Sequence, residues 1–199
     1  MRQILFAAIL ALTLSGCETG PTEPPRASVV VSRQFGAKSF ERVAIVVVNR
    51  TGVQLEQGTL NQIENTFTKF CIAKGYILAT RSDVKQALDE VAFQHSGVTE
   101  EALAAKARIL AVDAILLVSI DDISGRTTTP IIRVEGDRYE DWTVSVSAKL
   151  LSAEKAQVLV LADFTGTRFV INGSGIPQLI QSVAQIVAAG IPGQTGVGR

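Results

Sequence analysis

Two nearly unbroken runs of apolar residues constrain the fold of this chain most strongly. Val43–Val48 and Ile115–Ile120 are rich in β-branched side chains and contain almost no polar residue. Runs of this length are typical of strands that are covered on both faces. Helical patterns fill the segment between them, and alternation of strand and helix is typical of parallel sheets. The sequence therefore predicts an α/β fold with a mixed sheet and helices on both faces, and Val43–Val48 as its central strand.

The helical patterns between the two runs have recognisable ends. Gly75 is suited to the C-terminal cap of the first helix, and Tyr76–Ala79 predicts a short strand after it. Ser82 and Thr99 have side chains that can cap the beginnings of a second and a third helix. The first helix carries apolar residues at the helical period: Leu60, Ile63, Phe67, Phe70 and Cys71.

The second half of the chain follows a different pattern. Apolar and polar residues alternate from Trp142 to Leu150, which predicts a strand with one face in water. Val158–Phe164 predicts its antiparallel partner, and Ile131–Val134 predicts a further strand across the turn at residues 135–137. A last helix is expected from Ile176 to Gly190, with Pro177 in its first turn.

The N-terminus has the features of a bacterial lipoprotein signal. Arg2 precedes an apolar run, and Leu14-Ser15-Gly16-Cys17 matches a lipobox. We expect cleavage between Gly16 and Cys17, and acylation of Cys17 by chains such as palmitate, which would anchor the protein to a membrane. An ordinary signal peptide with a chance cysteine is the alternative. Glu18, where an aspartate would favour retention in the inner membrane, favours the periplasmic face of the outer membrane.

Composition changes along the chain predict four segments. Residues 1–16 form the signal peptide, and residues 17–27 form a tether whose prolines keep it extended over roughly 30 Å. Residues 28–190 form one α/β domain, which begins with a short strand at Val29–Val31. Residues 191–199 form a glycine-rich tail that we expect to be disordered.

Composition also argues against several functions. The 19 basic and 19 acidic residues leave no excess positive charge for a nucleic-acid partner. His95 is the only histidine, so a solvated loop residue is favoured over a catalytic triad or a metal site. Asp121-Asp122 is interpreted as a charged strand exit, and Cys71 as buried filler rather than a reactive thiol. We expect no enzyme, no cofactor and no metal.

Two positions are candidates for contact with a partner. Asn49-Arg50-Thr51 follows the first apolar run, at the carboxyl end of a strand where α/β sheets tend to bind ligands. A plain polar strand exit is the alternative there. Trp142 is the second candidate. The motif Gly173-Ser174-Gly175 before the last helix superficially resembles a phosphate loop, but helix capping explains it better, since the lysine of such loops is absent.

The order of these elements resembles that of a periplasmic lipoprotein family. This family contains the curli secretion channel CsgG and the penicillin-binding-protein activator LpoB. The resemblance covers about residues 41–120. It implies an anticodon-binding-like domain that makes protein contacts rather than catalysing a reaction. The matching segments are Val43–Thr51, the helix that ends at Gly75, Arg81-Ser82-Asp83 leading to Glu90, and Ser96-Gly97 leading to Val112–Leu116.

The sequence departs from both named relatives. The segment from Asp121 to Asp141 carries too many charges to supply two lipid-facing strands of a CsgG-like channel. The tether is short where an LpoB-like activator has a long one. We therefore expect a lipid-anchored, non-enzymatic accessory protein that binds other envelope proteins in wall synthesis, surface-structure assembly or secretion. The alternative is a subunit of an oligomeric CsgG-like secretion complex in the outer membrane, and homo-oligomers are compatible with both.

Overall fold

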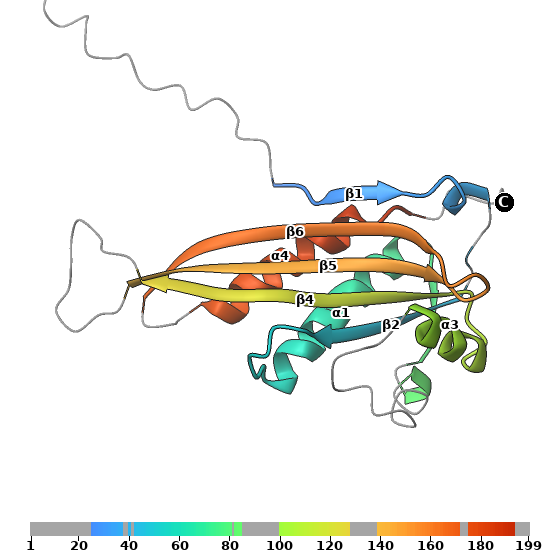
Figure 1. Ribbon diagram of the computed structural model, residues 1–199, viewed down its shortest axis with the longest axis horizontal. Helices are drawn as coiled ribbons and strands as arrows, with labels where there is room; N and C mark the ends of the chain where they lie inside the picture. The colour runs from blue at the N-terminus through green and yellow to red at the C-terminus, as the bar shows by residue number, and fades with distance from the viewer. Residues whose placement is uncertain are drawn as a thin grey trace, which may run out of the picture.

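The computed structural model shows an α/β domain built on one mixed sheet (Figure 1). It describes residues 25–37, 40, 42–80, 82–84, 100–127, 139–171 and 175–193. The elements are, in chain order, β1 (Ser28–Val31), a 3-10 turn (Phe35–Ala37), β2 (Arg42–Asn49), α1 (Gln57–Ala73), β3 (Ile77–Leu78), α3 (Glu100–Ile109), β4 (Ala114–Thr127), β5 (Tyr139–Ser152), β6 (Val158–Ile171) and α4 (Ile176–Gly190).

The sheet has six strands in the order β1-β6-β5-β4-β2-β3. β2 pairs in parallel with β3 and β4, whereas β4, β5, β6 and β1 pair antiparallel in succession. α1 and α4 contact each other and cover one face, behind the long strands in Figure 1. α3 packs on the other face against β4 and β5. The predicted mixed sheet with helices on both faces is therefore confirmed.

The first apolar run forms β2, but the prediction that it lies in the middle of the sheet is wrong. β3 is only two residues long and is the last strand, so β2 lies one strand from that end. Val43 and Ile45 join the core cluster under α1, while Ala44 and Val46 join the cluster that contains Ala107 of α3. The run is apolar because both of its faces are covered, and it does not report a central position.

The three long strands extend well beyond their predicted bounds. Each of β4, β5 and β6 has 14 residues. Asp121-Asp122 was interpreted as a strand exit, and this interpretation is wrong. β4 continues through both residues to Thr127, with a β-bulge between Ile120 and Asp122. These polar residues are compatible with the strand because the sheet face beyond the bulge has no described helix over it.

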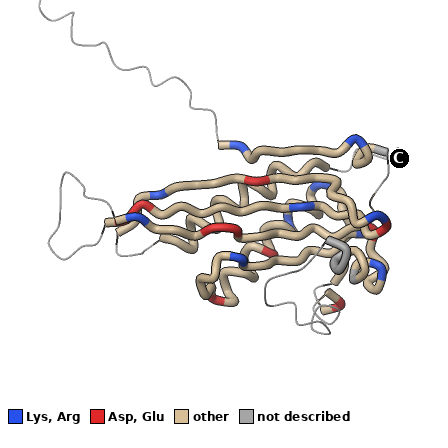
Figure 2. Tube along the Cα trace, in the orientation of Figure 1, with Lys and Arg blue, Asp and Glu red and all other residues tan. Residues whose placement is uncertain are grey.

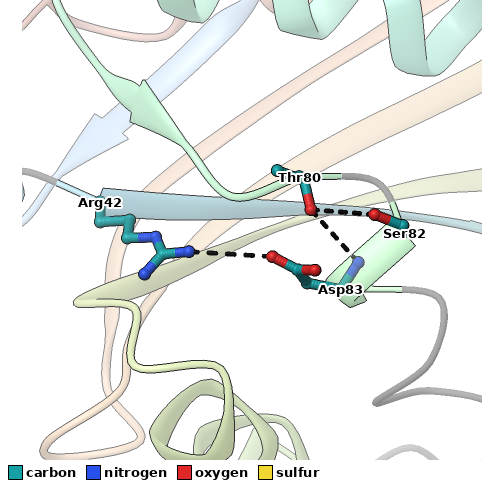
Figure 3. A network of polar contacts seen from close by, with 4 residues as sticks. All are labelled: Arg42, Thr80, Ser82 and Asp83. Carbon is teal, nitrogen blue, oxygen red and sulfur yellow. Dashed lines mark hydrogen bonds and ion pairs between the residues drawn. The ribbon is translucent and has the colours of Figure 1, made fainter.

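The ends of the helices largely agree with the predictions. Gly75 follows α1 with a φ of +88°, and Gly175 precedes α4 with a φ of +96°, values that glycine adopts without steric cost. The predicted cap at Ser82 is wrong. Thr80 caps the helical turn at residues 82–84, because its Oγ1 accepts from the Asp83 backbone N–H at 3.3 Å (Figure 3).

The packed domain continues past its predicted end at residue 190. Ile191 is buried, and the Tyr76 hydroxyl donates to the Pro192 carbonyl at 2.9 Å. Residues 191–193 therefore belong to the domain rather than to the tail. Several predictions lie outside the described residues: the signal and Cys17, the strand at Ile131–Val134 with its turn, His95, Thr99, Gly173-Ser174 and the tail at 194–199.

Candidate binding surface

The loop at the carboxyl end of β2 uses its polar side chains to hold its own shape. Asn49 Nδ2 donates to the Val53 carbonyl at 2.6 Å, and Asn49 Oδ1 accepts from the Thr51 backbone N–H at 3.1 Å. Thr51 Oγ1 donates to the same Asn49 oxygen and accepts from the Val53 N–H. The Arg50 N–H continues the ladder to the Ile120 carbonyl at 3.0 Å. Asn49 and Thr51 thus have structural roles, and partner binding by this loop stays a prediction.

Trp142 also has a structural role. It is half-buried against the main core cluster, and its indole Nε1 donates to Glu140 Oε2 at 2.7 Å. The indole lies directly over Gly125 of the neighbouring strand, where an added Cβ would come within 2.7 Å of Trp142 Cε2. Trp142 therefore stabilises the pairing of the C-terminal end of β4 with the N-terminal end of β5. Partner binding by its indole likewise stays a prediction.

Beyond the part that α3 covers, the long strands present a polar face with no described helix over it. Val144, Val146 and Ala148 of β5 point to the α4 side, so the residues between them point the opposite way. The uncovered face carries hydroxyl pairs: Ser145 and Thr165 lie 2.7 Å apart, Thr143 and Thr167 lie 3.3 Å apart, and Ser147 donates to Asp121. These side chains bond to one another across the strands and leave a polar surface.

β1 is one of the two edge strands of the sheet, and three of its four residues are exposed valines. It pairs only with β6, and no described strand pairs with its other side. All four residues of β1 are exposed, and Val30 retains 62% of its surface. An uncovered edge strand with three consecutive valines offers backbone donors and acceptors beside apolar side chains. We call the side of Ser28–Val31 that faces away from β6 the β1 edge.

A shallow groove lies between α4 and the residues just before β1. Its volume is about 430 Å³. Arg26 and Ala27 line one side, and Gln185, Ile186 and Gly190 are among the residues of α4 that line the other. Ala27 and Val29 face Gly190, where an added Cβ would come within 3.0 Å of both side chains. We call this feature the α4 groove, and it adjoins the amino-terminal part of the β1 edge.

The charged residues that flank the β1 edge are both positive. Arg26 and Arg33 are exposed and flank the strand, and α4 carries no charged residue (Figure 2). Neither arginine forms an ion pair within the part of the chain that the structure describes. Asp163, the acidic residue of β6, is opposite Ser28 but points to the uncovered face, away from the α4 groove. The β1 edge and the α4 groove therefore present a positive, apolar surface.

A cluster at the end of α4 ties the C-terminal segment to α1. Lys74 Nζ donates to the Ala188, Ala189 and Ile191 carbonyls, which lie at the C-terminal end of α4 where a cation is favoured. Burial raises the pKa of the Cys71 thiol to about 11, with a smaller opposing effect from Lys74. Burial also raises the pKa of Tyr76 and lowers that of Lys74. Cys71 is thus a protonated core residue, as predicted.

The described residues offer little for metal chemistry or for a membrane-spanning helix. Within them, no three histidine, cysteine or acidic side chains gather as a metal would require. None of the described helices combines the length and the hydropathy that crossing a membrane requires. A further polar network joins the start of β2 to the turn that follows β3: Arg42 lies 3.9 Å from Asp83, beside Thr80 and Ser82 (Figure 3).

Comparison with known proteins gives structural matches only. No protein-family model matches the chain, and no curated protein matches it. The chain is similar to the PelC dodecamer from Paraburkholderia phytofirmans, with 16% identity, 82% of this chain and 94% of that chain covered, and a TM-score of 0.43. It is similar to lipoprotein GNA1162 from Neisseria meningitidis, with 14% identity, 71% and 93% covered, and a TM-score of 0.45. It is also similar to the LpoB C-terminal domain from Escherichia coli, with 14% identity, 65% and 82% covered, and a TM-score of 0.40. The predicted resemblance to the family that contains CsgG stays a prediction.

The β1 edge and the α4 groove were not predicted as a site. The sequence did contain a signal for them, because Arg26 and Arg33 bracket three consecutive valines. The pairing of β1 with β6 joins segments about 130 residues apart, and local patterns carry no information on such a contact.

Proposed function

We propose that this chain is a lipid-anchored accessory protein of the outer membrane, whose α/β domain binds another envelope protein on the periplasmic side and catalyses no reaction. The observation that carries the proposal is Cys17, placed at the end of an apolar run and directly after Leu14-Ser15-Gly16. A protein acylated there is anchored by lipid chains and leaves the whole folded domain exposed to the periplasm.

The described domain supports a binding role in two ways. The polar hydroxyl pairs of β5 and β6 lie on a part of the sheet with no described helix over it, and β1 leaves its edge unpaired in the described part of the chain. An edge strand with exposed valines, such as β1, commonly marks a site of protein contact. Among the described residues, Cys71 is buried with a raised thiol pKa, and the polar side chains of the Asn49 loop bond to one another, so neither favours a catalytic role.

The two cysteines allow a matched test of the anchor. The full chain is produced in a bacterium with two membranes that is fed a palmitate analogue, beside the variants Cys17→Ser and Cys71→Val. We expect label and membrane association in the wild type and in Cys71→Val, and neither in Cys17→Ser. Label that persists in Cys17→Ser, or a wild-type chain that is unlabelled in the cytosol, would refute the proposal.

A second measurement separates the accessory role from that of a secretion subunit. The purified lipoprotein is reconstituted into planar bilayers at defined protein concentrations. The accessory role predicts no conductance above that of empty bilayers. Discrete channel currents from the wild-type lipoprotein would favour the secretion complex and contradict the proposal.

A further inference from the structure

We propose that the β1 edge and the adjoining α4 groove form a strand-addition site for an extended, acidic segment of an envelope protein. This inference rests on the proposed function for the location of the partner and on the structure for the chemistry of the site. The bound segment would extend the six-stranded sheet by one strand, with an acidic residue near each end of its apolar centre.

The register of β1 identifies the backbone groups that are available. The Ser32 N–H donates to the Leu159 carbonyl at 2.8 Å, so Ser32 is bonded towards β6. In an antiparallel ladder, bonded residues alternate with residues whose groups point away, so Val30 is bonded inward as well. The N–H and C=O groups of Val29 and Val31 therefore point outward, along the β1 edge, as an added strand requires.

The side chains on the two faces of β1 give such a site its specificity. Val29 points towards α4 beside Gly190, whereas Val30 points to the uncovered face. A strand added at the β1 edge would have alternate side chains on the same face as Val29. The α4 groove adjoins this face, and Ala27 and Ile186 are among its apolar lining residues. An apolar side chain of the bound segment therefore fits the groove.

Charge decides between the possible occupants. Arg26 and Arg33 lie seven residues apart in the sequence and flank the strand. If a second copy paired through β1, its arginines would lie beside these in either orientation, and like charges that face each other across strands are destabilising. Acidic residues at the ends of the bound segment would instead complement both arginines. The charges thus favour a partner of a different sequence.

The position of β1 in the chain places the site close to the anchor. Ser28 follows Cys17 by eleven residues, and a chain of this length spans at most about 40 Å when fully extended. An acylated Cys17 would therefore keep the β1 edge near the membrane surface. The partner segment must therefore be able to reach the surface of that membrane.

Two synthetic peptides test the site. Each is acetylated and amidated and alternates valine with threonine over five central residues; one has a glutamate at both ends and the other a lysine. They are titrated into the mature lipoprotein in detergent while backbone amide exchange is followed by NMR. The glutamate peptide should slow exchange at Val29 and Val31 and leave the already bonded Val30 unchanged. The lysine peptide should bind about tenfold more weakly.

A proline variant tests the backbone contact without removing a bond of the native sheet. Val31→Pro deletes an outward N–H, and proline is tolerated on an edge strand when its nitrogen faces solvent. We expect it to weaken the glutamate peptide at least about tenfold, because one bond is lost and the ring obstructs the added strand. The matched control Val30→Thr keeps every backbone group of β1 and should change affinity less than about twofold.

A charge-reversal variant keeps the inference falsifiable if the proline variant is unstable. The double variant Arg26→Glu/Arg33→Glu should reverse the preference, so that the lysine peptide binds more tightly than the glutamate peptide. Lys69→Glu, at an exposed position of α1, is the control and should leave the preference unchanged. An unchanged preference in the double variant would overturn the charge argument.

Three outcomes would overturn the inference while leaving the anchor intact: no binding of either peptide to the wild type at millimolar concentration, equal binding to Val31→Pro, or self-association of the lipoprotein that Val31→Pro abolishes. The last outcome would assign the β1 edge to a second copy. Failure of the anchor is recognised separately, by the absence of palmitate label on Cys17.

Discussion

The two halves of the sheet differ in how they are covered. β2 and the first half of β4 have apolar side chains on both faces, between α1 on one side and α3 on the other. β6, β1 and the part of β5 beyond α3 are covered by α4 on one face, and their other face carries hydroxyls and Asp163. Both halves contribute residues to the main core cluster, but the half-covered region also leaves one sheet face available for binding.

The largest expected effect concerns the covered half. Phe67 of α1 is fully buried in the main core cluster, so Phe67→Ala should lower the free energy of unfolding by about 3–5 kcal/mol. Thr165→Ala on the uncovered face loses only the hydroxyl contact with Ser145 and should cost less than about 1 kcal/mol. Urea denaturation measures both. Equal losses would contradict the comparison.

The next effect is a pH dependence of the free energy of unfolding, caused by Cys71 in the covered half. Because the pKa of Cys71 rises from 9.0 to about 11 on folding, the unfolded chain releases a proton that the folded chain keeps. Stability should therefore fall between pH 9 and 11, by up to about 2–3 kcal/mol from this group. The raised pKa of Tyr76 has the same sign, and the lowered pKa of Lys74 has the opposite one.

Cys71→Val identifies the source of this dependence. Valine keeps an apolar side chain at the site and removes the titrating thiol, so urea midpoints should fall less steeply from pH 9 to 11 than in the wild type. An identical slope in the variant would assign the dependence to other groups.

Two glycines, one in β6 and one in α1, differ in the space around their Cα atoms. A Cβ at Gly166 of β6 would lie 2.7 Å from Val183 Cγ2 of α4, so Gly166→Ala should cost about 1–3 kcal/mol. Val183→Ala in the same chain should relieve part of that cost, which a double-mutant cycle measures. Gly58→Ala in α1 meets no atom within 4 Å and should stabilise by about 0.5–1 kcal/mol. A stabilising Gly166→Ala would contradict the close contact between Gly166 of β6 and Val183 of α4.

A smaller effect is expected where α4 meets α1. Lys74→Met removes the donor to the Ala188, Ala189 and Ile191 carbonyls and the charge at the end of the helix. We expect a loss of about 1–2 kcal/mol and faster amide exchange in the last turn of α4. Unchanged exchange there would show that the cluster does not hold the C-terminal segment.

The smallest effect is expected at the exposed network beside β3. Asp83→Asn removes the ion pair with Arg42, whose atoms lie 3.9 Å apart in solvent, and should change stability by less than about 0.5 kcal/mol. Asp113→Ala should cost more, about 1 kcal/mol, since Asp113 Oδ2 accepts from the Arg42 backbone N–H at 2.9 Å. The reverse order in thermal unfolding would contradict this ranking.

The covered half was the easier half to predict from the sequence. Val43–Val48 and Ile115–Ile120 identify their strands because burial on both faces requires a continuous apolar run. The glycines at 75 and 175 identify helix ends because their backbone has positive φ. The predicted central position of β2 is wrong. A continuous apolar run indicates that both faces of a strand are covered, but it does not indicate how many strands lie on either side.

The half-covered region was harder to predict, for a physical reason. Asp121 and Asp122 look like the end of a strand, but a strand with one face in water can carry them, so β4 continues to Thr127. The candidate binding residues were also only partly predictable from the sequence. Asn49 and Thr51 were selected for their position, and the structure gives them bonds within their own loop. The β1 edge depends on pairing with β6, which no local pattern contains.

The intact mass of the mature polypeptide tests the central claim most directly. The lipoprotein is purified from membranes without proteolysis, and the masses of the intact chain and of its N-terminal fragment are measured. The account predicts a chain that begins at Cys17 and carries the added mass of acyl chains on that residue. A chain that begins elsewhere, or a Cys17 with an unmodified thiol, would contradict it.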